Sequence, residues 1–450
     1  MRAGCYITNE AKKEYWKEVK LRAGESEDRM HVVNLYPEFQ RQTIEGFGGA
    51  FTEAAADTFA KLSREAQEEI LEAYFGESGL KYNMGRCTIH SCDFARGNYT
   101  YVEENDETLD SFSIDHDREQ ILPLIKRAME KASEKMHFLA SPWSPPAYMK
   151  TNGEMNHGGK LKEEYRALWA EYVTRFLHSY RDEGIDVKYI TVQNEPEAVQ
   201  TWDSCIYTAA EEGVFVLQYL APALQKAELS DVGIFIWDHN KEAAFERADG
   251  TLSVPGTNDM VEGVAVHWYT GDHFDSLRLI REKYPDKRIF FTEGCVEYSR
   301  FADSNEVQKA EMYAHDMAGN FNAGVEAELD WNLILDENGG PNHVGNYCAA
   351  PIMCDTGTGT VDRRLTYYYI GHFSRYIRRG ARSIATTAFT DKIDAAAFVN
   401  PNGERVTVLL NKSDEDLEIT LRENGRGTAV TLPAHSLATV IFEESCSTEP

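Results

Sequence analysis

From Ile44 onward, short runs rich in β-branched residues alternate regularly with helical stretches. This alternation is typical of a parallel sheet whose strands are connected by helices. Eight strands are predicted, at residues 44–48, 83–89, 136–140, 189–193, 234–237, 264–267, 289–292 and 328–335. Eight βα units over roughly 300 residues are the pattern of a closed barrel. We therefore predict an α/β fold with a (β/α)8 TIM barrel over residues 41–379.

Two of the connecting helices are marked by their hydrophobic period. One lies between Ser63 and Gly76, which are a helix start signal and a helix stop signal. The other ends before Gly184 and carries an apolar stripe at helical spacing, formed by Tyr165, Leu168, Trp169, Tyr172, Val173, Phe176, Leu177 and Tyr180. We interpret these aromatic residues as packing residues and not as a binding site.

The two ends of the chain are predicted to form a second, smaller domain. After about Ala381 the hydrophobic period changes from helical to alternating, as in Val406, Val408 and Leu410. Turn signals such as Asn424-Gly425 separate the alternating runs. Residues 1–40 contain short strand-like segments that cannot form a core alone, so we expect them to supply the missing strand. The prediction is an attached antiparallel β-sandwich built from both chain ends, residues 1–40 plus 380–450.

Two predicted strands each deliver a glutamate at the carboxyl end. The strand that begins at Tyr189 must stop before Pro196, which leaves Glu195 at its end. The run 288–294 likewise presents Glu293. Two carboxyl groups at a barrel rim can cut a glycosidic bond, since one stabilises the oxocarbenium-like state and the other protonates the leaving oxygen. Like charges resist ionising together, so we expect one glutamate to keep its proton. For either glutamate alone, a salt bridge at a strand end would be the simpler interpretation.

Aromatic and polar residues gather at the same predicted strand ends. They include Asp93, Trp143, Asn194, Trp202, Trp237, His239, His267, Trp268, Tyr269 and Trp331. A pyranose has apolar C–H faces and a ring of hydroxyl groups, so it binds between aromatic rings flanked by Asp, Asn and Glu side chains. Each tryptophan taken alone is explained by core packing. Gathered at one rim, they predict a sugar site.

Charge and hydropathy exclude several classes of partner. With 46 basic and 74 acidic residues, the formal net charge is −28, so nucleic acid and anionic membrane surfaces would repel the chain. No stretch approaches the roughly 18 apolar residues of a membrane span. The amino terminus lacks the apolar segment of a signal peptide. We therefore expect a cytoplasmic protein without stable membrane association, and the oligomeric state is left open.

Metal binding is a weaker interpretation of the polar residues at the rim. His90, Asp93, His239 and His267 could converge as the zinc site of a metal-dependent hydrolase. The sequence has no His-x-His or His-x-x-x-His pair to support such a site. The eight cysteines form no C-x-x-C framework, so we expect free thiols. The prediction is an enzyme that needs neither a metal nor an organic cofactor.

Longer motifs make this sequence similar to one enzyme family. They are residues 45–54 (EGFGGAFTEA), 91–94 (SCDF), 140–146 (ASPWSPP), 150–153 (KTNG), 192–196 (VQNEP), 266–269 (VHWY), 291–294 (FTEG), 331–332 (WN) and 339–342 (GGPN). In this order, and over the whole barrel, they resemble glycoside hydrolase family 30, the group of lysosomal glucosylceramidase. The resemblance implies a retaining glycosidase with a (β/α)8 barrel and a sandwich built from both chain ends.

The resemblance also implies roles for individual residues. Glu195 would be the general acid/base and Glu293 the nucleophile. Asn194 would bind the sugar 2-hydroxyl, while Tyr269 and His267 would touch the nucleophile. The residues expected to hold the glucose hydroxyls are Asp93, Trp143, Trp331 and Asn346, and Trp202 is expected to contact substrate in a stretch that is shorter than in the lysosomal enzyme.

We therefore expect a retaining, exo-acting β-glycosidase, an O-glycosyl hydrolase that is glucosylceramidase-like and hydrolyses β-D-glucosides. The net charge of −28 favours a soluble β-glucoside over a lipid-surface substrate. A β-xylosidase, a β-fucosidase and a β-1,6-glucanase of the same family are the alternatives within this class. A non-catalytic carbohydrate-binding protein is the alternative of another class.

Overall fold

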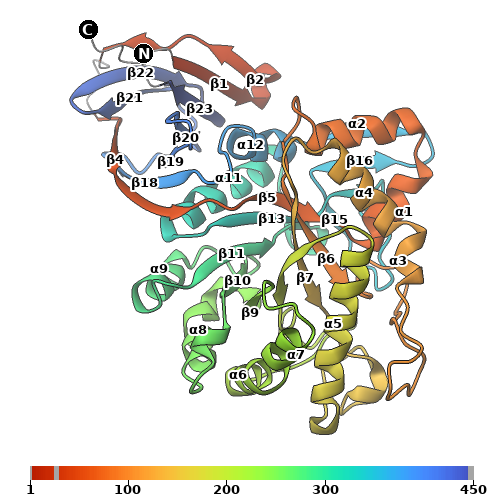
Figure 1. Ribbon diagram of the computed structural model, residues 1–450. Helices are drawn as coiled ribbons and strands as arrows, with labels where there is room; N and C mark the ends of the chain where they lie inside the picture. The colour runs from red at the N-terminus through yellow and green to blue at the C-terminus, as the bar shows by residue number, and fades with distance from the viewer. Residues whose placement is uncertain (1–2, 25–29, 444–450) are drawn as a thin grey trace. The chain divides into compact units, whose positions relative to one another are not determined.

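The computed structural model describes residues 3–24 and 30–443, and eight parallel strands in it close into a barrel (Figure 1). In order around the barrel they are β5 (Gly46–Ala50), β6 (Met84–Ile89), β7 (His137–Pro142), β8 (Val187–Thr191), β9 (Gly233–Asn240), β10 (Gly263–His267), β11 (Arg288–Glu293) and β13 (Ala327–Asn332). Each corresponds to one of the eight predicted strands, so the prediction of a TIM barrel is confirmed.

The connections between these strands are mainly helical. The helices are α1 (Glu53–Lys61), α2 (Arg64–Phe75), α3 (Asp115–Glu119), α4 (Ile121–Lys131), α5 (Arg166–Asp182), α6 (Ala209–Phe215), α7 (Ala221–Lys226), α8 (Ala244–Leu252), α9 (Phe274–Lys283) and α10 (Tyr298–Phe301). Both helices predicted from their period are present. The Ser63 hydroxyl accepts a hydrogen bond from the Ala66 amide at the start of α2, and α5 buries the predicted residues Trp169, Tyr172 and Phe176.

One layer of the barrel interior is apolar. The buried cluster there consists of Met84, Leu139, Phe235, Ala265, Phe290, Ala327 and Leu329, with Tyr189 packed against it. Burying such side chains stabilises the barrel by about 25 cal/mol per Å² of apolar surface. Polar side chains replace apolar ones toward the carboxyl ends of the strands, so the apolar layer supports the polar layer in which a site can form.

Short strands extend the rim of the barrel. β12 (Val296–Glu297) pairs with β15 (Cys348–Ala349), which places Glu297 opposite Cys348. A three-stranded sheet contains β14 (Ile334–Asp336), β16 (Ile352–Asp355) and β17 (Thr360–Arg363). These segments follow β11 and β13, so they add side chains near the carboxyl ends of those strands.

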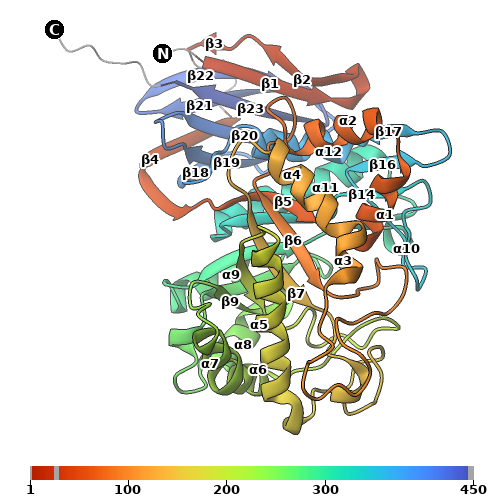
Figure 2. The same cartoon turned by 45° about the vertical axis from the view of Figure 1, so that its right-hand side comes forward.

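A second compact unit contains a ten-stranded, mostly antiparallel sheet that folds into a sandwich. Its strands are β1 (Ala3–Asn9), β2 (Glu14–Val19), β3 (Arg22–Ala23), β4 (Val32–Thr43), β18 (Arg382–Ala388), β19 (Ile393–Val399), β20 (Arg405–Asn411), β21 (Leu417–Glu423), β22 (Arg426–Leu432) and β23 (Ser436–Phe442). Strand β1 pairs antiparallel with β23, with Ala3 opposite Phe442 and Asn9 opposite Ser436, so the first and last described strands lie side by side (Figure 2). The expected β-sandwich built from both ends is therefore present, and helices α11 (Glu306–Ala323) and α12 (Leu365–Ser374) belong to the same unit.

Among residues 3–24 and 30–443, no helix combines the length and the apolar character needed to cross a membrane. The seven cysteines in these ranges are all free and buried, and the eighth, Cys446, lies outside the described residues.

Candidate active site

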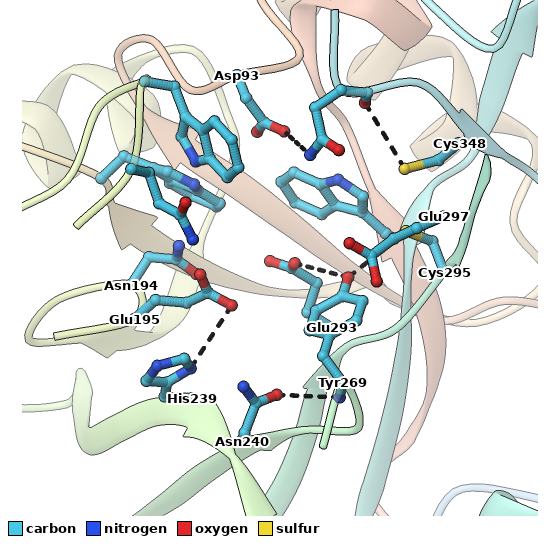
Figure 3. Close-up of a pocket in the computed structure, with 15 residues that line it drawn as sticks. Asp93, Asn194, Glu195, His239, Asn240, Tyr269, Glu293, Cys295, Glu297 and Cys348 are labelled. Carbon is cyan, nitrogen blue, oxygen red and sulfur yellow. Dashed lines mark hydrogen bonds and ion pairs between the residues drawn. The ribbon is translucent and has the colours of Figure 1, made fainter. Parts of the chain in front are cut away.

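A pocket lies at the carboxyl ends of the barrel strands (Figure 3). The residues that line it are Asp93, Trp143, Asn194, Glu195, Gln200, Trp202, His239, Asn240, Tyr269, Glu293, Cys295, Glu297, Trp331, Asn346 and Cys348. The predicted site residues are among them except His267, Trp237 and Trp268. His267 is fully buried next to Glu195, and the two tryptophans are buried outside the pocket lining, so for them the core-packing interpretation holds. The fold therefore brings both glutamates into one cavity.

Arg86, in the middle of β6, connects the polar groups below the pocket. Its side chain is 0% exposed. The guanidinium donates hydrogen bonds to Glu293 Oε2, to Asp238 Oδ2 at 2.8 Å and to Asn194 Oδ1 at 2.9 Å. A planar guanidinium offers five donors in a fixed arrangement, so one residue holds three acceptors from three strand ends in a single geometry.

The same guanidinium lies against two of the pocket tryptophans. It is 4.9 Å from the ring centre of Trp143 and 5.5 Å from that of Trp331. The two indole rings stack with their centres 5.3 Å apart. The cation–π contacts stabilise the buried charge, and the paired indoles form an apolar wall of the pocket.

The carboxylate of Glu293 is held through both of its oxygens. Oε2 accepts a hydrogen bond from Arg86, and Oε1 accepts one from the Tyr269 hydroxyl at 2.9 Å. Tyr269 is in turn held by its backbone amide, which donates to Asn240 Oδ1 at 2.9 Å. The predicted contact between Tyr269 and Glu293 is thus present, and it leaves the carboxylate in one orientation toward the pocket.

His267 does not make the contact that we expected for it. Its Nδ1 lies 3.3 Å from Glu195 Oε1, and its Nε2 lies 3.1 Å from Asp238 Oδ1. We expected His267 to touch Glu293, but no hydrogen bond joins the two residues. The histidine instead connects Glu195 to the buried carboxylate of Asp238.

The backbone departs from regular strand geometry at Glu195 and Asp238, and this sets the directions of their side chains. Glu195 has φ 49°, in the left-handed region that side chains other than glycine rarely adopt, and its amide donates to the Asp238 carbonyl at 2.9 Å. In β9 the register against β10 skips Asp238, because Ala265 pairs with Trp237 and Val266 with His239. Such a bulge turns an extra side chain toward the barrel axis. Left-handed residues cost about 1–3 kcal/mol each and concentrate at functional sites.

The electrostatics of the Glu195–His267 pair differ from the expectation that one glutamate keeps its proton. Burial raises the pKa of Glu195, but the positive charges of His239 and His267 lower it below its ordinary value. Burial would lower the pKa of His267, whereas the charge of Glu293 and the hydrogen bonds to Asp238 and Glu195 raise it to about 9. The proton therefore resides on His267, beside Glu195. For Glu195 the expectation therefore fails, because the sequence did not indicate this pairing with His267.

The opposite side of the pocket carries Asp93 and an asparagine pair. Asn346 Nδ2 donates to Asp93 Oδ2 at 3.2 Å, and Asn342 Nδ2 does so at 3.4 Å. Burial and the nearby charge of Glu293 raise the pKa of Asp93 to about 8. A protonated Asp93 can donate as well as accept a hydrogen bond, which suits recognition of hydroxyl groups.

The structure does not assemble the four-residue zinc site considered above. His90 is fully buried, with Nδ1 2.8 Å from the Tyr172 hydroxyl and Nε2 beside the Ser144 carbonyl. Asp93 accepts a hydrogen bond from Asn346 on the opposite side of the pocket. Of these four residues, only His239 and His267 lie close together. Both lie next to Glu195, which was not part of the predicted set.

Several site residues were not predicted. Arg86 could have been found, because a charged residue inside an otherwise apolar strand requires a buried partner. Asp238 follows a predicted strand, but only the bulge turns it inward. Gln200, Asn240, Cys295, Glu297 and Cys348 come from strand ends, loops and short rim strands, and no residue pattern pointed to them.

Comparisons with known proteins agree with this architecture. The profile of the glycosyl hydrolase family 30 TIM-barrel domain matches residues 44–377, and that of the glycosyl hydrolase family 30 β-sandwich domain matches residues 380–440. Together the two profiles span most of the chain and both of its folded parts.

Individual relatives are similar over most of their length. Lysosomal acid glucosylceramidase of Mus musculus is 32% identical over 429 residues, which cover 91% of this chain and 83% of that protein. The crystal structure of SrfJ from Salmonella typhimurium has a TM-score of 0.94 at 37% identity and covers 99% of this chain and 100% of that chain. The endo-β1,6-glucanase BT3312 has a TM-score of 0.88 at 25% identity and covers 98% and 100%.

We predict that Arg86→Met lowers the free energy of unfolding by about 3–5 kcal/mol, because removing one partner leaves Asp238 and Glu293 as poorly compensated buried charges. Denaturant unfolding followed by tryptophan fluorescence measures this. Arg86→Lys is the matched control: it keeps the charge but loses the planar donor set, so its loss is expected to be smaller. A methionine variant as stable as the parent protein would show that the guanidinium does not hold the site together.

Proposed function

The chain belongs to glycoside hydrolase family 30, and from that premise we propose that it is a retaining, exo-acting β-glucosidase with two glutamates acting in double displacement. As a member of this family it is a glycosidase that acts on carbohydrate substrates. The observation that carries the finer proposal is the pocket arrangement of Glu293, fixed by Arg86 and Tyr269, and Glu195, paired with protonated His267. One carboxylate is oriented to attack while the other stands beside a proton.

In the first step Glu293 attacks the anomeric carbon and the bond from that carbon to the leaving oxygen breaks. His267, 3.3 Å away, passes its proton to the ionised Glu195, which delivers that proton to the leaving oxygen and is ionised again. In the second step Glu195 takes a proton from water as the water oxygen bonds to the anomeric carbon and Glu293 departs, and the proton returns from Glu195 to His267. The charge of Asp238 on the far side of His267 stabilises the imidazolium from which the proton comes.

Recognition of the sugar is assigned to the opposite wall. Asp93 and Asn346 supply hydrogen-bonding groups for hydroxyls, and Trp143 with Trp331 offers an apolar face to the ring. Asn194 has its oxygen fixed by Arg86, which directs its amide nitrogen away from the guanidinium and toward a 2-hydroxyl. The cavity is small, about 140 Å³, which favours a single terminal sugar over a bound chain.

Support for a glucoside comes from the likeness to a glucosylceramidase that covers 91% of this chain. An endo-β1,6-glucanase also matches, over 98% of this chain, so a β-1,6-linked glucan is the second candidate substrate. The polar residues Gln200 and Glu297 line the pocket and favour the glucan, because they suit a hydroxylated leaving group better than a lipid chain. The net charge of −28 favours a substrate away from anionic membrane surfaces.

A panel of nitrophenyl β-glycosides, extended by a β-1,6-linked glucan, tests the sugar assignment. We expect the glucoside to exceed the xyloside, fucoside and galactoside in kcat/KM, because Asp93 and Asn346 would each lose a partner with a misplaced hydroxyl. A 2-deoxy-2-fluoro-glucoside should leave a covalent adduct on Glu293, detectable by peptide mass spectrometry. Absence of both turnover and adduct would favour the non-catalytic carbohydrate-binding alternative.

Two variants separate the roles of the glutamates. Glu293→Gln should lower kcat/KM by several orders of magnitude for every substrate, because the nucleophile is lost. Glu195→Ala should lower kcat/KM for alkyl glucosides by about 10²–10⁴-fold but spare aryl glucosides with activated leaving groups, which need no proton. Equal losses on alkyl and aryl substrates in Glu195→Ala would contradict the acid assignment.

The pH dependence follows from the groups that surround His267, which are Glu195 just after β8, Asp238 and His239 from β9, Tyr269 just after β10 and Glu293 from β11. The three carboxylates raise the pKa of His267 to about 9, so the proton is held below that pH and lost above it. We expect kcat/KM for an alkyl glucoside to fall as the pH rises through about 9. In His267→Gln this decline should move to lower pH, and an unchanged profile would refute the proton-holding role.

A further inference from the structure

Two histidines flank the carboxylate of Glu195. His267 Nδ1 lies 3.3 Å from Glu195 Oε1, and His239 Nδ1 lies 3.6 Å from the same oxygen. One ligand atom from each of these three residues lies within 4.8 Å of the other two. The histidines come from β9 and β10, and the bulge at Asp238 brings His239 into register with Val266, beside His267.

The His239 ring is held in place without satisfying its Nδ1. This nitrogen is buried and has no hydrogen-bond partner among the described residues. The ring packs on Trp237 with centres 4.9 Å apart, which fixes its plane. At 3.6 Å, Glu195 Oε1 is too distant for a hydrogen bond. Buried polar atoms without partners are uncommon in folded proteins and call for an explanation such as an absent ligand.

The other ring nitrogen of His267 has the partner that metal-binding histidines have. Nε2 faces Asp238 Oδ1 at 3.1 Å, and Asp238 is itself fixed by Arg86 and Thr292. A carboxylate that accepts a hydrogen bond from one ring nitrogen leaves the other nitrogen available as a ligand and orients the ring. Nδ1 of His267 is thereby aimed at the space shared with Glu195 and His239.

The distances from Glu195 to the two histidine nitrogens suit a small divalent cation. Zinc binds histidine nitrogen and carboxylate oxygen at about 2.0–2.2 Å in tetrahedral geometry, so two of its ligand atoms lie about 3.4 Å apart. The distances of 3.3 and 3.6 Å from Glu195 Oε1 fall on either side of that value. Two histidines, one glutamate and an open fourth position toward the pocket form a donor set that zinc uses in hydrolytic enzymes.

We propose that Glu195, His239 and His267 form a binding site for Zn²⁺ or a chemically similar divalent cation, and that filling it inhibits the enzyme. The cation takes the place of the proton between Glu195 and His267 and occupies the lone pairs with which Glu195 exchanges protons. The binding site follows from the three side chains alone. The inhibition rests on the proposed function, because it requires Glu195 to act as acid and base.

A second group of soft ligands lies in the same pocket and must be separated in the test. The thiols of Cys295 and Cys348 both line the cavity, and Cys295 Sγ lies 3.5 Å from the Tyr269 hydroxyl. Thiols also bind zinc. Dependence on Cys348 would therefore place the cation at the thiol pair.

The test is titration of the metal-free protein with ZnCl₂ alone, by isothermal titration calorimetry, with turnover measured in parallel. We expect one Zn²⁺ per chain and inhibition reversed by a chelator. His239→Asn should raise the Kd by about 10–100-fold or more, the effect of losing a ligand or its support. His178→Asn, an exposed position on α5, is the matched control and should bind as the parent protein does.

Glu195→Gln provides a second variant whose readout needs no activity, and it should also weaken binding, because an amide is a poorer zinc ligand than a carboxylate. Unchanged Zn²⁺ affinity in both His239→Asn and Glu195→Gln would overturn the proposal. So would loss of binding in Cys348→Ser, or the absence of binding to the parent protein below about 1 mM, a free energy near −4 kcal/mol. If Zn²⁺ binds as expected but does not inhibit, the site stands and the proposed role of Glu195 fails.

Discussion

The buried guanidinium of Arg86 is the constraint on which the site depends. A positive charge with 0% exposed side chain is stable only with good partners, and here they are Glu293, Asp238 and Asn194 from three other strands. Their hydrogen bonds can form together only when β6, β8, β9 and β11 are in register. The orientation of the reacting groups therefore depends on the packing of the barrel. The apolar layer around Phe235 and Phe290 sets the strand register, and this register brings the acceptors to Arg86.

Asp238 connects Arg86 to His267, which takes part in proton transfer. One of its oxygens accepts from Arg86 and Thr191, and the other from His267 and Thr292. The negative charge beside His267 helps to raise the pKa of that histidine to about 9, so a proton is available to Glu195 in a pocket whose other wall holds Glu293. The same geometry leaves His239 Nδ1 without a partner, which is what makes the site receptive to a cation. The left-handed backbone at Glu195, Trp237 and Asp238 is the strain that this arrangement carries.

Much of this could be predicted from the sequence, because periodicity reports the large features directly. The eight strands, the sandwich at the chain ends and the two glutamates at strand ends all follow from patterns of two or 3.6 residues and from residues that stop strands. The side chains at strand ends, such as Trp143 and Asp93, were predictable because strand ends of a parallel barrel share one rim. The partner of His267 was not, because a single-residue bulge at Asp238 changes which side chains point inward without changing the local pattern. The protonation of the pair was therefore also missed. Glu297 and Cys348 reach the pocket from short rim strands, where neither period applies.

The central claim is that a fixed Glu293 carboxylate attacks the sugar while Glu195 and His267 manage the proton on the other side. The most direct measurement is the anomeric configuration of the first-formed product, followed by proton NMR during hydrolysis of a β-glucoside. Two displacements at the anomeric carbon restore the starting configuration, so the β-anomer should form first and the α-anomer should grow only by slow mutarotation. An α-anomer formed first would mean a single displacement by water, with Glu293 as a base, and would contradict the account.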